Sequence, residues 1–423
     1  MIRLLAVLAA FTLSPTAIFA ADFAITGGKV VTNQNGQIIE NGTVVIKGNR
    51  IVEVGPSSSV TIPAGFETID AKGKWVTPGL FVPFSRVGMV EIALEKTTND
   101  TRAKESPFSV ALQAIDSFNP KSENVAITRL EGVTRMAILP DASHTIFGGR
   151  GALVDTSGDF MVERAAPAFV FIQMGEYGAS IAGGSRSASW TWLRQAVAEA
   201  RAWRRGREPA EPLMLTADAL ALQQALRDDL PFLVHVERAS DLMNLIHFKQ
   251  EMDGIDIIAV GATEGWMVAE QLKEAEISVI LDPHDNLPQG FENLGATMYN
   301  AKRLHDAGVT IAIADLHDEA FNARLAPQHA GNTLATGLDW NTAFAAISSV
   351  PAQMFGVDDQ YGQLAAGMEA DLVIWDGDPL ELMSAPDMVY ISGEKQQMQS
   401  RQTLLRDRYM DKGADQTLPY AYR

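Results

Sequence analysis

The chain has 423 residues, and 47% of them are hydrophobic, which is enough to build a large core. It carries 34 basic and 52 acidic residues, for a formal net charge of −18, so nucleic acid is not expected as a partner. It has no cysteine, which excludes disulfides, thiolate metal ligands and a cysteine nucleophile.

The first twenty residues have the pattern of a secretory signal peptide. Arg3 precedes the apolar run 4–13, which is too short to span a bilayer, and Ala20 offers a small-residue cleavage site. No later apolar run has transmembrane length. We therefore expect a secreted protein without a membrane span, and the lack of cysteine fits a bacterial periplasm.

Residues 22–76 are expected to form a β-meander. Short β-branched runs alternate there with turn signals, and Asn35-Gly36 is a strong one because both of its positions favour positive φ. About fifty residues of such strands cannot bury both faces of a sheet, so they need a partner from elsewhere in the chain.

After this meander, apolar strands alternate with helical segments, which indicates a parallel α/β sheet. The expected strands include 80–84, 133–139, 168–174, 232–236, 255–260, 277–281 and 309–314. Strands this apolar are covered on both faces, as in a closed barrel. Within the long excursion 89–132, the polar stretch 95–107 is a candidate lid over the strand ends.

Two segments carry a family resemblance. Thr77–Leu80 reads T-P-G-L at the start of the first expected barrel strand, and residues 362–375 follow the pattern G-x-L-x-x-G-x-x-A-D-L-V-x-W. Both resemble the amidohydrolase superfamily of metal-dependent hydrolases, in particular its imidazolonepropionase-like and dipeptidase-like members. The resemblance implies an α/β fold with a (β/α)8 TIM-like barrel over residues 78–355. It also implies a small β-sandwich built from residues 21–77 and 356–423.

In that family the metal ligands lie at the C-terminal ends of the barrel strands. They are an H-x-H pair on strand 1, a lysine or glutamate on strand 4, histidines on strands 5 and 6, and an aspartate on strand 8. Four of these positions are occupied here by other residues, namely Phe84, Arg86, Phe171 and Gly261. Two positions match, His235 on strand 5 and Asp315 on strand 8.

Two ligands are fewer than the three that a zinc site usually needs. His235 and Asp315 could hold one divalent metal such as zinc with a further ligand, or the protein could hold none. The nearest further ligands in the sequence are Glu237, Glu264, His317 and Asp318. Equally, His235 could be a hydrogen-bonded core residue, and Asp315 could cap a turn.

Arg86 suggests a different kind of site. Its guanidinium could bind a carboxylate of a substrate, or it could pair with Asp315. The remaining histidines with helical or loop positions are interpreted as structural or solvated: His247, His284, His305 and His329.

The resemblance implies hydrolysis of an amide C–N bond in a cyclic, linear or dipeptide-like compound. His235 would help to hold the metal or act as a general base, and Asp315 would move the proton. The alternative is a non-catalytic periplasmic protein that keeps the barrel pocket, where Arg86 and His235 meet an anionic ligand. The expected partner is a small molecule, and the chain could also form a homo-oligomer.

Overall fold

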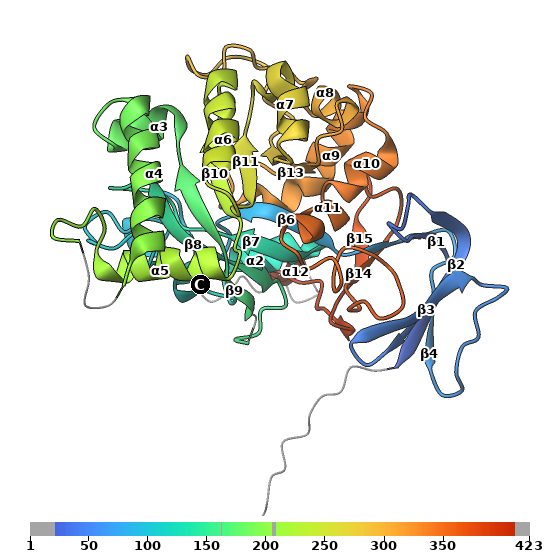
Figure 1. The fold of residues 1–423 in the computed structure, drawn as a ribbon. Helices are drawn as coiled ribbons and strands as arrows, with labels where there is room; N and C mark the ends of the chain where they lie inside the picture. Colours follow the sequence, from blue (N-terminus) through green and yellow to red (C-terminus); the bar gives the residue numbers. More distant parts are fainter. Residues whose placement is uncertain (1–21, 162, 205–208, 411–423) are drawn as a thin grey trace, which may run out of the picture.

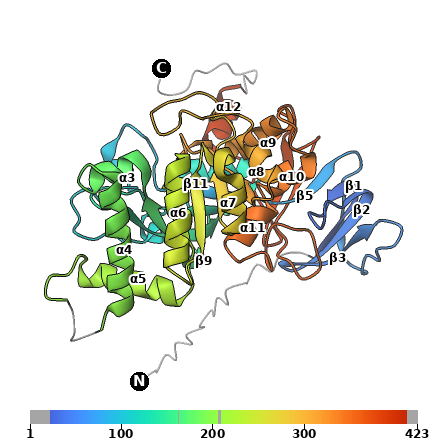
Figure 2. The ribbon, with the colours of Figure 1, turned by 45° about the horizontal axis from the view of Figure 1, so that its top comes forward.

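The computed structural model describes residues 22–161, 163–204 and 209–410, so the expected signal peptide lies outside the described residues. Its described strands form two eight-stranded sheets, one of which is a nearly closed barrel flanked by helices. The predicted fold class is therefore confirmed. Figures 1 and 2 show the other sheet at one side of the barrel.

The first sheet combines strands from both ends of the described chain. Its members are β1 (Phe23–Val31), β2 (Ile38–Lys47), β3 (Arg50–Pro56), β4 (Glu67–Asp70), β5 (Trp75–Pro78), β14 (Leu372–Trp375), β15 (Pro386–Ile391) and β16 (Glu394–Lys395). Their order is β16-β15-β14-β5-β1-β2-β3, and β4 pairs with the first half of β1. The N-terminal meander is thus extended by the signature segment 362–375, because β5 pairs antiparallel with β14. The predicted domain boundaries, 77/78 and 355/356, stay predictions.

A buried ion pair between Arg135 and Asp371 connects this sheet to the barrel. Arg135 of the barrel strand β7 (Val133–Ile138) donates from Nη2 at 3.1 Å to Oδ1 of Asp371, the residue directly before β14. Both side chains are almost fully buried, and the guanidinium also lies 4.2 Å from the ring centroid of Tyr361. The Asp of the A-D-L-V signature therefore joins two parts of the fold.

The barrel sheet runs in sequence order from β6 to β13. Its strands are β6 (Leu80–Ser85), β7 (Val133–Ile138), β8 (Phe147–Asp155), β9 (Glu163–Gln173), β10 (Phe232–Val236), β11 (Ile257–Gly261), β12 (Ser278–Leu281) and β13 (Ile311–Ile313). Seven strands share one direction, whereas β8 is antiparallel to β7 and β9. The reason is the short connection 139–146, because a parallel crossover needs a dozen or more residues.

Backbone hydrogen bonds close the gap between the first and last barrel strands. The Phe81 N–H donates to the Ile347 carbonyl at 2.8 Å, and the Ile313 N–H donates to the Ala346 carbonyl at 3.0 Å. The chain segment between the last two barrel helices thus bridges β6 and β13.

Helices cover the outside of the barrel (Figure 1). They are α1 (Ala114–Ser117), α2 (Glu123–Leu130), α3 (Gly175–Ile181), α4 (Arg186–Ala202), α5 (Thr216–Arg227), α6 (Ala239–Glu251), α7 (Ala269–Glu274), α8 (Asn300–Asp306), α9 (Ala326–Leu334), α10 (Trp340–Ala345), α11 (Ser349–Met354) and, near the C-terminus, α12 (Arg401–Met410). Three 3-10 turns are η1 (Lys96–Thr98), η2 (Gly265–Val268) and η3 (Asn322–Leu325). No described helix has both the length and the apolar character that a bilayer span requires.

Side chains of the barrel strands alternate between two cores, as the two-residue period of a strand dictates. Phe81, Phe171 and Leu233 point into the barrel interior, whereas Val82, Ile172 and Val234 pack against the helices. Both faces of these strands are buried, which is why their sequences are almost continuously apolar.

Candidate functional site

The C-terminal ends of the parallel strands meet at one rim of the barrel. Arg86 directly follows β6, and His235 lies near the end of β10. Asp282 directly follows β12, and Asp315 lies two residues after β13. The three residues that the sequence analysis singled out, Arg86, His235 and Asp315, are therefore placed on the same rim.

Arg86 is enclosed by carboxylates. Its Nη2 lies 3.3 Å from Asp141 Oδ1, and its Nη1 contacts Glu319 Oε1. Asp141 also pairs with Arg102, so two cations and two carboxylates alternate in one network. Burial lowers the pKa of Arg86 while Asp141 opposes the shift, but a guanidinium starts so high that it stays charged. The expected pair with Asp315 is not among the ion pairs of the described residues.

Aromatic packing fills the region beneath this network. The rings of Phe84 and Phe171 meet edge to face, with 5.8 Å between their centroids. Both side chains are buried in the barrel interior. Carbon atoms therefore occupy two of the positions at which the resemblance placed metal ligands.

Both ring nitrogens of His235 are engaged. Nδ1 lies 2.9 Å from Gln173 Nε2, and Nε2 lies 3.0 Å from Glu237 Oε1. Burial lowers the pKa of His235, but the hydrogen bond and the charge of Glu237 outweigh burial and raise that pKa above its ordinary value. Burial likewise raises the pKa of Glu237, and the contacts with His235 and Thr263 outweigh it and lower that pKa. The two side chains form a hydrogen-bonded pair.

Asp315 has two kinds of contact. Its Oδ1 accepts the backbone N–H groups of His317 at 2.9 Å and Asp318 at 2.7 Å, which is the turn cap considered above. Its Oδ2 accepts from the Asn322 amide at 3.1 Å and lies 3.6 Å from His329 Nε2. Asp315 therefore caps a turn and also faces a buried histidine of α9.

His329 belongs to a group that the sequence analysis missed. His284 Nδ1 lies 3.5 Å and His329 Nδ1 lies 3.8 Å from Asp282 Oδ1. The two imidazole rings meet edge to face at 4.2 Å. Asp282 and His284 directly follow a predicted strand, and this was a usable signal. Nothing in the sequence indicates that His329 joins them.

The other expected ligands have separate partners. Glu264 accepts the backbone N–H groups of Ala239 and Gly295, each at 3.0 Å, so it holds loops together. His317 Nε2 lies 2.8 Å from Asp285 Oδ1, and this hydrogen bond raises the pKa of His317 to about 9.

A cavity of about 740 Å³ opens beside the Arg86 network. Arg86, Asp141 and Glu319 line it from the strand ends, and residues 90–105 supply much of its remaining wall. The candidate lid therefore borders the rim, and its mobility stays a prediction.

The comparisons with known proteins decide the family. The sequence model of the amidohydrolase family matches residues 141–398, more than half of the chain. The chain belongs to the amidohydrolase family. The predicted family is thus confirmed.

Similar proteins cover most of this amidohydrolase-family chain. Amidohydrolase tasK of Hapsidospora irregularis is 23% identical over 395 residues, which is 85% of this chain and 39% of that protein. This chain thus spans about two fifths of that relative's length. The solved amidohydrolase of Thermotoga maritima MSB8 has a TM-score of 0.79 at 22% identity, over 88% of this chain and 99% of the other. A zinc-bound adenosine deaminase of Xanthomonas campestris has a TM-score of 0.55 at 18% identity, over 92% and 97%. At these identities the structural likeness shows the fold alone.

Members of the amidohydrolase family usually bind a metal, so the residues of this member must be tested against one. Phe84 and Phe171 offer no lone pair, Arg86 is a cation, and both nitrogens of His235 are engaged. A histidine at position 261 would require the Glu237 carboxylate to move, because a Cβ there would lie 2.2 Å from Glu237 Oε1, and the backbone φ of +87° is one that side chains rarely adopt. Four of the family's six metal positions, 84, 86, 171 and 261, therefore hold residues that do not fit a metal, and the metal roles predicted for His235 and Asp315 stay predictions.

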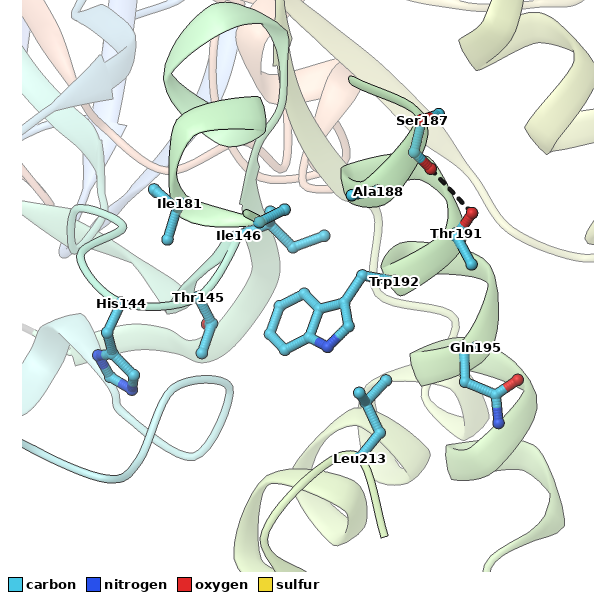
Figure 3. A pocket seen from close by; sticks show the side chains of 11 residues that line it. His144, Thr145, Ile146, Ile181, Ser187, Ala188, Thr191, Trp192, Gln195 and Leu213 are labelled. Atoms are coloured by element: carbon cyan, nitrogen blue, oxygen red, sulfur yellow. Dashed lines mark hydrogen bonds between the residues drawn. The ribbon is translucent and has the colours of Figure 1, made fainter. Parts of the chain in front are cut away.

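A second hollow, of about 600 Å³, lies between α4 and the segment before β8 (Figure 3). Trp192 of α4 projects into it between Ile146 and Leu213. Among the described residues that line it, His144 is the one titratable side chain. An amidohydrolase needs an acid and a base together, so we place the candidate site of this member at the rim.

Proposed function

We propose that this amidohydrolase-family protein hydrolyses a C–N bond of a small amide or dipeptide-like compound at the barrel rim. The observation that carries the proposal is that one rim holds both a carboxylate, on Asp315, and an imidazole with a raised pKa, on His235. Family membership supports hydrolysis as the class of reaction.

Amide hydrolysis needs a base and an acid. The base takes a proton from the attacking water, and the acid gives a proton to the nitrogen that leaves as the C–N bond breaks. In this proposal Asp315 is the base. His235 is the acid, because Glu237 stabilises its protonated form. This role replaces the predicted roles of His235 as metal ligand or general base.

The test is a turnover assay with N-acyl amino acids, cyclic amides and dipeptides. We expect release of amine by the wild type, and a fall in kcat of about 10²-fold in Asp315→Asn and in His235→Gln, since each removes one proton-transfer group. His247→Gln is the matched control, because His247 is exposed on α6. Unchanged kcat in both rim variants would contradict the proposed roles.

A specific observation favours a second candidate, a non-catalytic protein that binds an anionic small molecule. Arg86 Nε is buried and has no hydrogen-bond partner in the described part of the chain. A carboxylate that reached it would receive a charge-assisted hydrogen bond. Heat of binding for a carboxylate of the panel without amine release, lost in Arg86→Lys, would favour this candidate over hydrolysis.

We also propose that the protein is exported to a bacterial periplasm. The apolar run after Arg3, the small residues around Ala20 and the lack of cysteine support this. Mass spectrometry of the protein from a periplasmic fraction should give a mature chain that begins at Ala21. An intact N-terminus in the cytoplasmic fraction would contradict export.

A further inference from the structure

Three ligand-type side chains converge where β12, the loop after it and α9 meet. The nearest ligand atoms of Asp282, His284 and His329 all lie within 4.8 Å of one another. Two of the separations are 3.5 and 3.8 Å. A tetrahedral zinc ion with bonds of about 2.0–2.2 Å holds its ligand atoms about 3.3 Å apart. Small side-chain rotations would therefore bring the group to coordination distance.

His329 shows why this group is more than a chance cluster. Its side chain is only 5% exposed, and Nδ1 is buried without a hydrogen-bond partner among the described residues. Buried polar atoms are nearly always paired, so an orphaned nitrogen requires an explanation. Nδ1 is directed at Asp282, where a cation would accept its lone pair. We propose that Asp282, His284 and His329 bind one divalent metal ion, of which zinc suits the two imidazoles and one carboxylate.

The surroundings of the two histidines offer groups that could serve as the outer partners of metal ligands. A histidine ligand usually gives its other N–H to a carboxylate or an amide oxygen. Asp315 Oδ2 lies 3.6 Å from His329 Nε2, and the Asn332 side-chain amide lies 2.6 Å from His284 Nε2. Rotation of the Asn332 amide by 180° about its terminal bond places its oxygen, instead of its nitrogen, next to His284 Nε2, where it can accept that N–H. Asp315 is therefore a positioning residue for His329 in this site.

The carboxylate ligand is held as well. Asp282 Oδ1 accepts the backbone N–H of His284 at 2.9 Å, and Oδ2 accepts that of Leu316 at 3.2 Å. The second bond ties the end of β12 to the loop after β13. Asp282 is thus held by backbone N–H groups of the loops that follow two barrel strands.

The site would be open on one side. The His284 side chain is 43% exposed, and three protein ligands leave a fourth tetrahedral position for water or a ligand. This arrangement is typical of catalytic zinc sites, whereas structural sites have four protein ligands. The site does not depend on the proposed hydrolysis, and metal binding can be measured by itself.

The experiment measures zinc on the full chain, produced without a histidine tag and cleared with a chelator. After zinc is added and the excess is removed by dialysis, elemental analysis should find one zinc per chain. His284→Ala is the main variant, because an exposed side chain can be removed without loss of the fold. We expect it to weaken zinc binding at least 100-fold in calorimetry, and Asp315→Asn to weaken it about 10-fold to 100-fold.

Two controls locate the ion. His247→Ala and His235→Ala should both keep stoichiometric zinc with wild-type affinity. X-ray absorption at the zinc edge should show two imidazole nitrogens in the wild type and one in His284→Ala. A wild-type chain without zinc, equal affinity in His284→Ala, or loss of zinc in His235→Ala alone would each overturn the proposal. None of these readouts uses hydrolysis, so failure of the hydrolase proposal is a separate result.

Discussion

The rim of this barrel has two contrasting halves. Around β6 and β10, the two basic side chains have carboxylate partners: Arg86 lies between Asp141 and Glu319, and His235 pairs with Glu237, although Arg86 Nε has no hydrogen-bond partner among the described residues. Around β12 and β13, two histidines and two aspartates face one another, and the buried Nδ1 of His329 has no hydrogen-bond partner in the described chain.

The contrast separates a half of the rim whose charges balance one another from a half whose buried imidazole lacks a hydrogen-bond partner among the described residues. The charge of a guanidinium flanked by two carboxylates is balanced without a cofactor. A buried imidazole nitrogen beside a carboxylate has its hydrogen-bonding capacity satisfied only when a proton or a metal ion lies between the two atoms. Three predictions test this difference.

The largest effect is expected for Arg86→Met. It leaves Glu319 without its cationic partner and Asp141 with Arg102 alone, and breaking a buried pair typically costs about 3–5 kcal/mol of unfolding free energy. Urea unfolding of wild type and variant measures the loss. Arg406→Met is the control, since its ion pair with Asp407 is solvent-exposed and contributes little. If Arg86→Met loses as little unfolding free energy as Arg406→Met, the network around Arg86 does not contribute to stability.

A smaller effect is expected at Gly261. Gly261→Ala combines a strained φ of +87° with a Cβ against Glu237, which should cost about 2–3 kcal/mol. Gly254→Ala separates the two causes, because its φ is +78° and nothing lies within 4 Å of the added Cβ, so about 1 kcal/mol is expected. Thermal unfolding measures both. If Gly261→Ala lowers the melting temperature no more than Gly254→Ala does, position 261 at the end of β11 has room for a side chain.

The smallest effect concerns pH and the half around β12. The hydrogen bond to Asp285 raises the pKa of His317 to about 9, above an unfolded value of about 6.5. The pair therefore stabilises the fold fully below about pH 6.5, and this contribution is lost as the pH rises through about 9. Because His317 is about half exposed, solvent screening limits the gain to about 0.5 kcal/mol.

The variant for this pH effect is His317→Gln. It should lower the melting temperature slightly at pH 6 and leave it unchanged at pH 10, in metal-free protein. An equal shift at both pH values would show that the proton on His317 has no part in the stability.

Much of the architecture could be predicted because its signals are local. The T-P-G-L segment, the signature 362–375 and the apolar strands each lie within one short stretch of sequence. Burial on both faces makes a barrel strand apolar along its length, so the strands could be found one at a time. The reversal of β8 was not predicted, although the short connection 139–146 is the physical reason for it.

The candidate site was harder to predict because its partners come from distant positions. Arg86 was recognised, but its contacts with Asp141 and Glu319 depend on how loops after β7 and β13 fold over the rim. His284 and His329 were interpreted as structural or solvated, and they lie 4.2 Å apart between ring centroids.

The sequence by itself determined the family frame, the apolar strands and the replacement of most of the usual metal ligands, because residue identity and two-residue or helical periods carry that information. Only the tertiary structure decided which charges compensate each other and which buried nitrogens, such as His329 Nδ1 and Arg86 Nε, have no hydrogen-bond partner among the described residues. Pairing at the rim depends on separations of a few ångströms between residues far apart in the chain, and those separations arise only when the barrel closes.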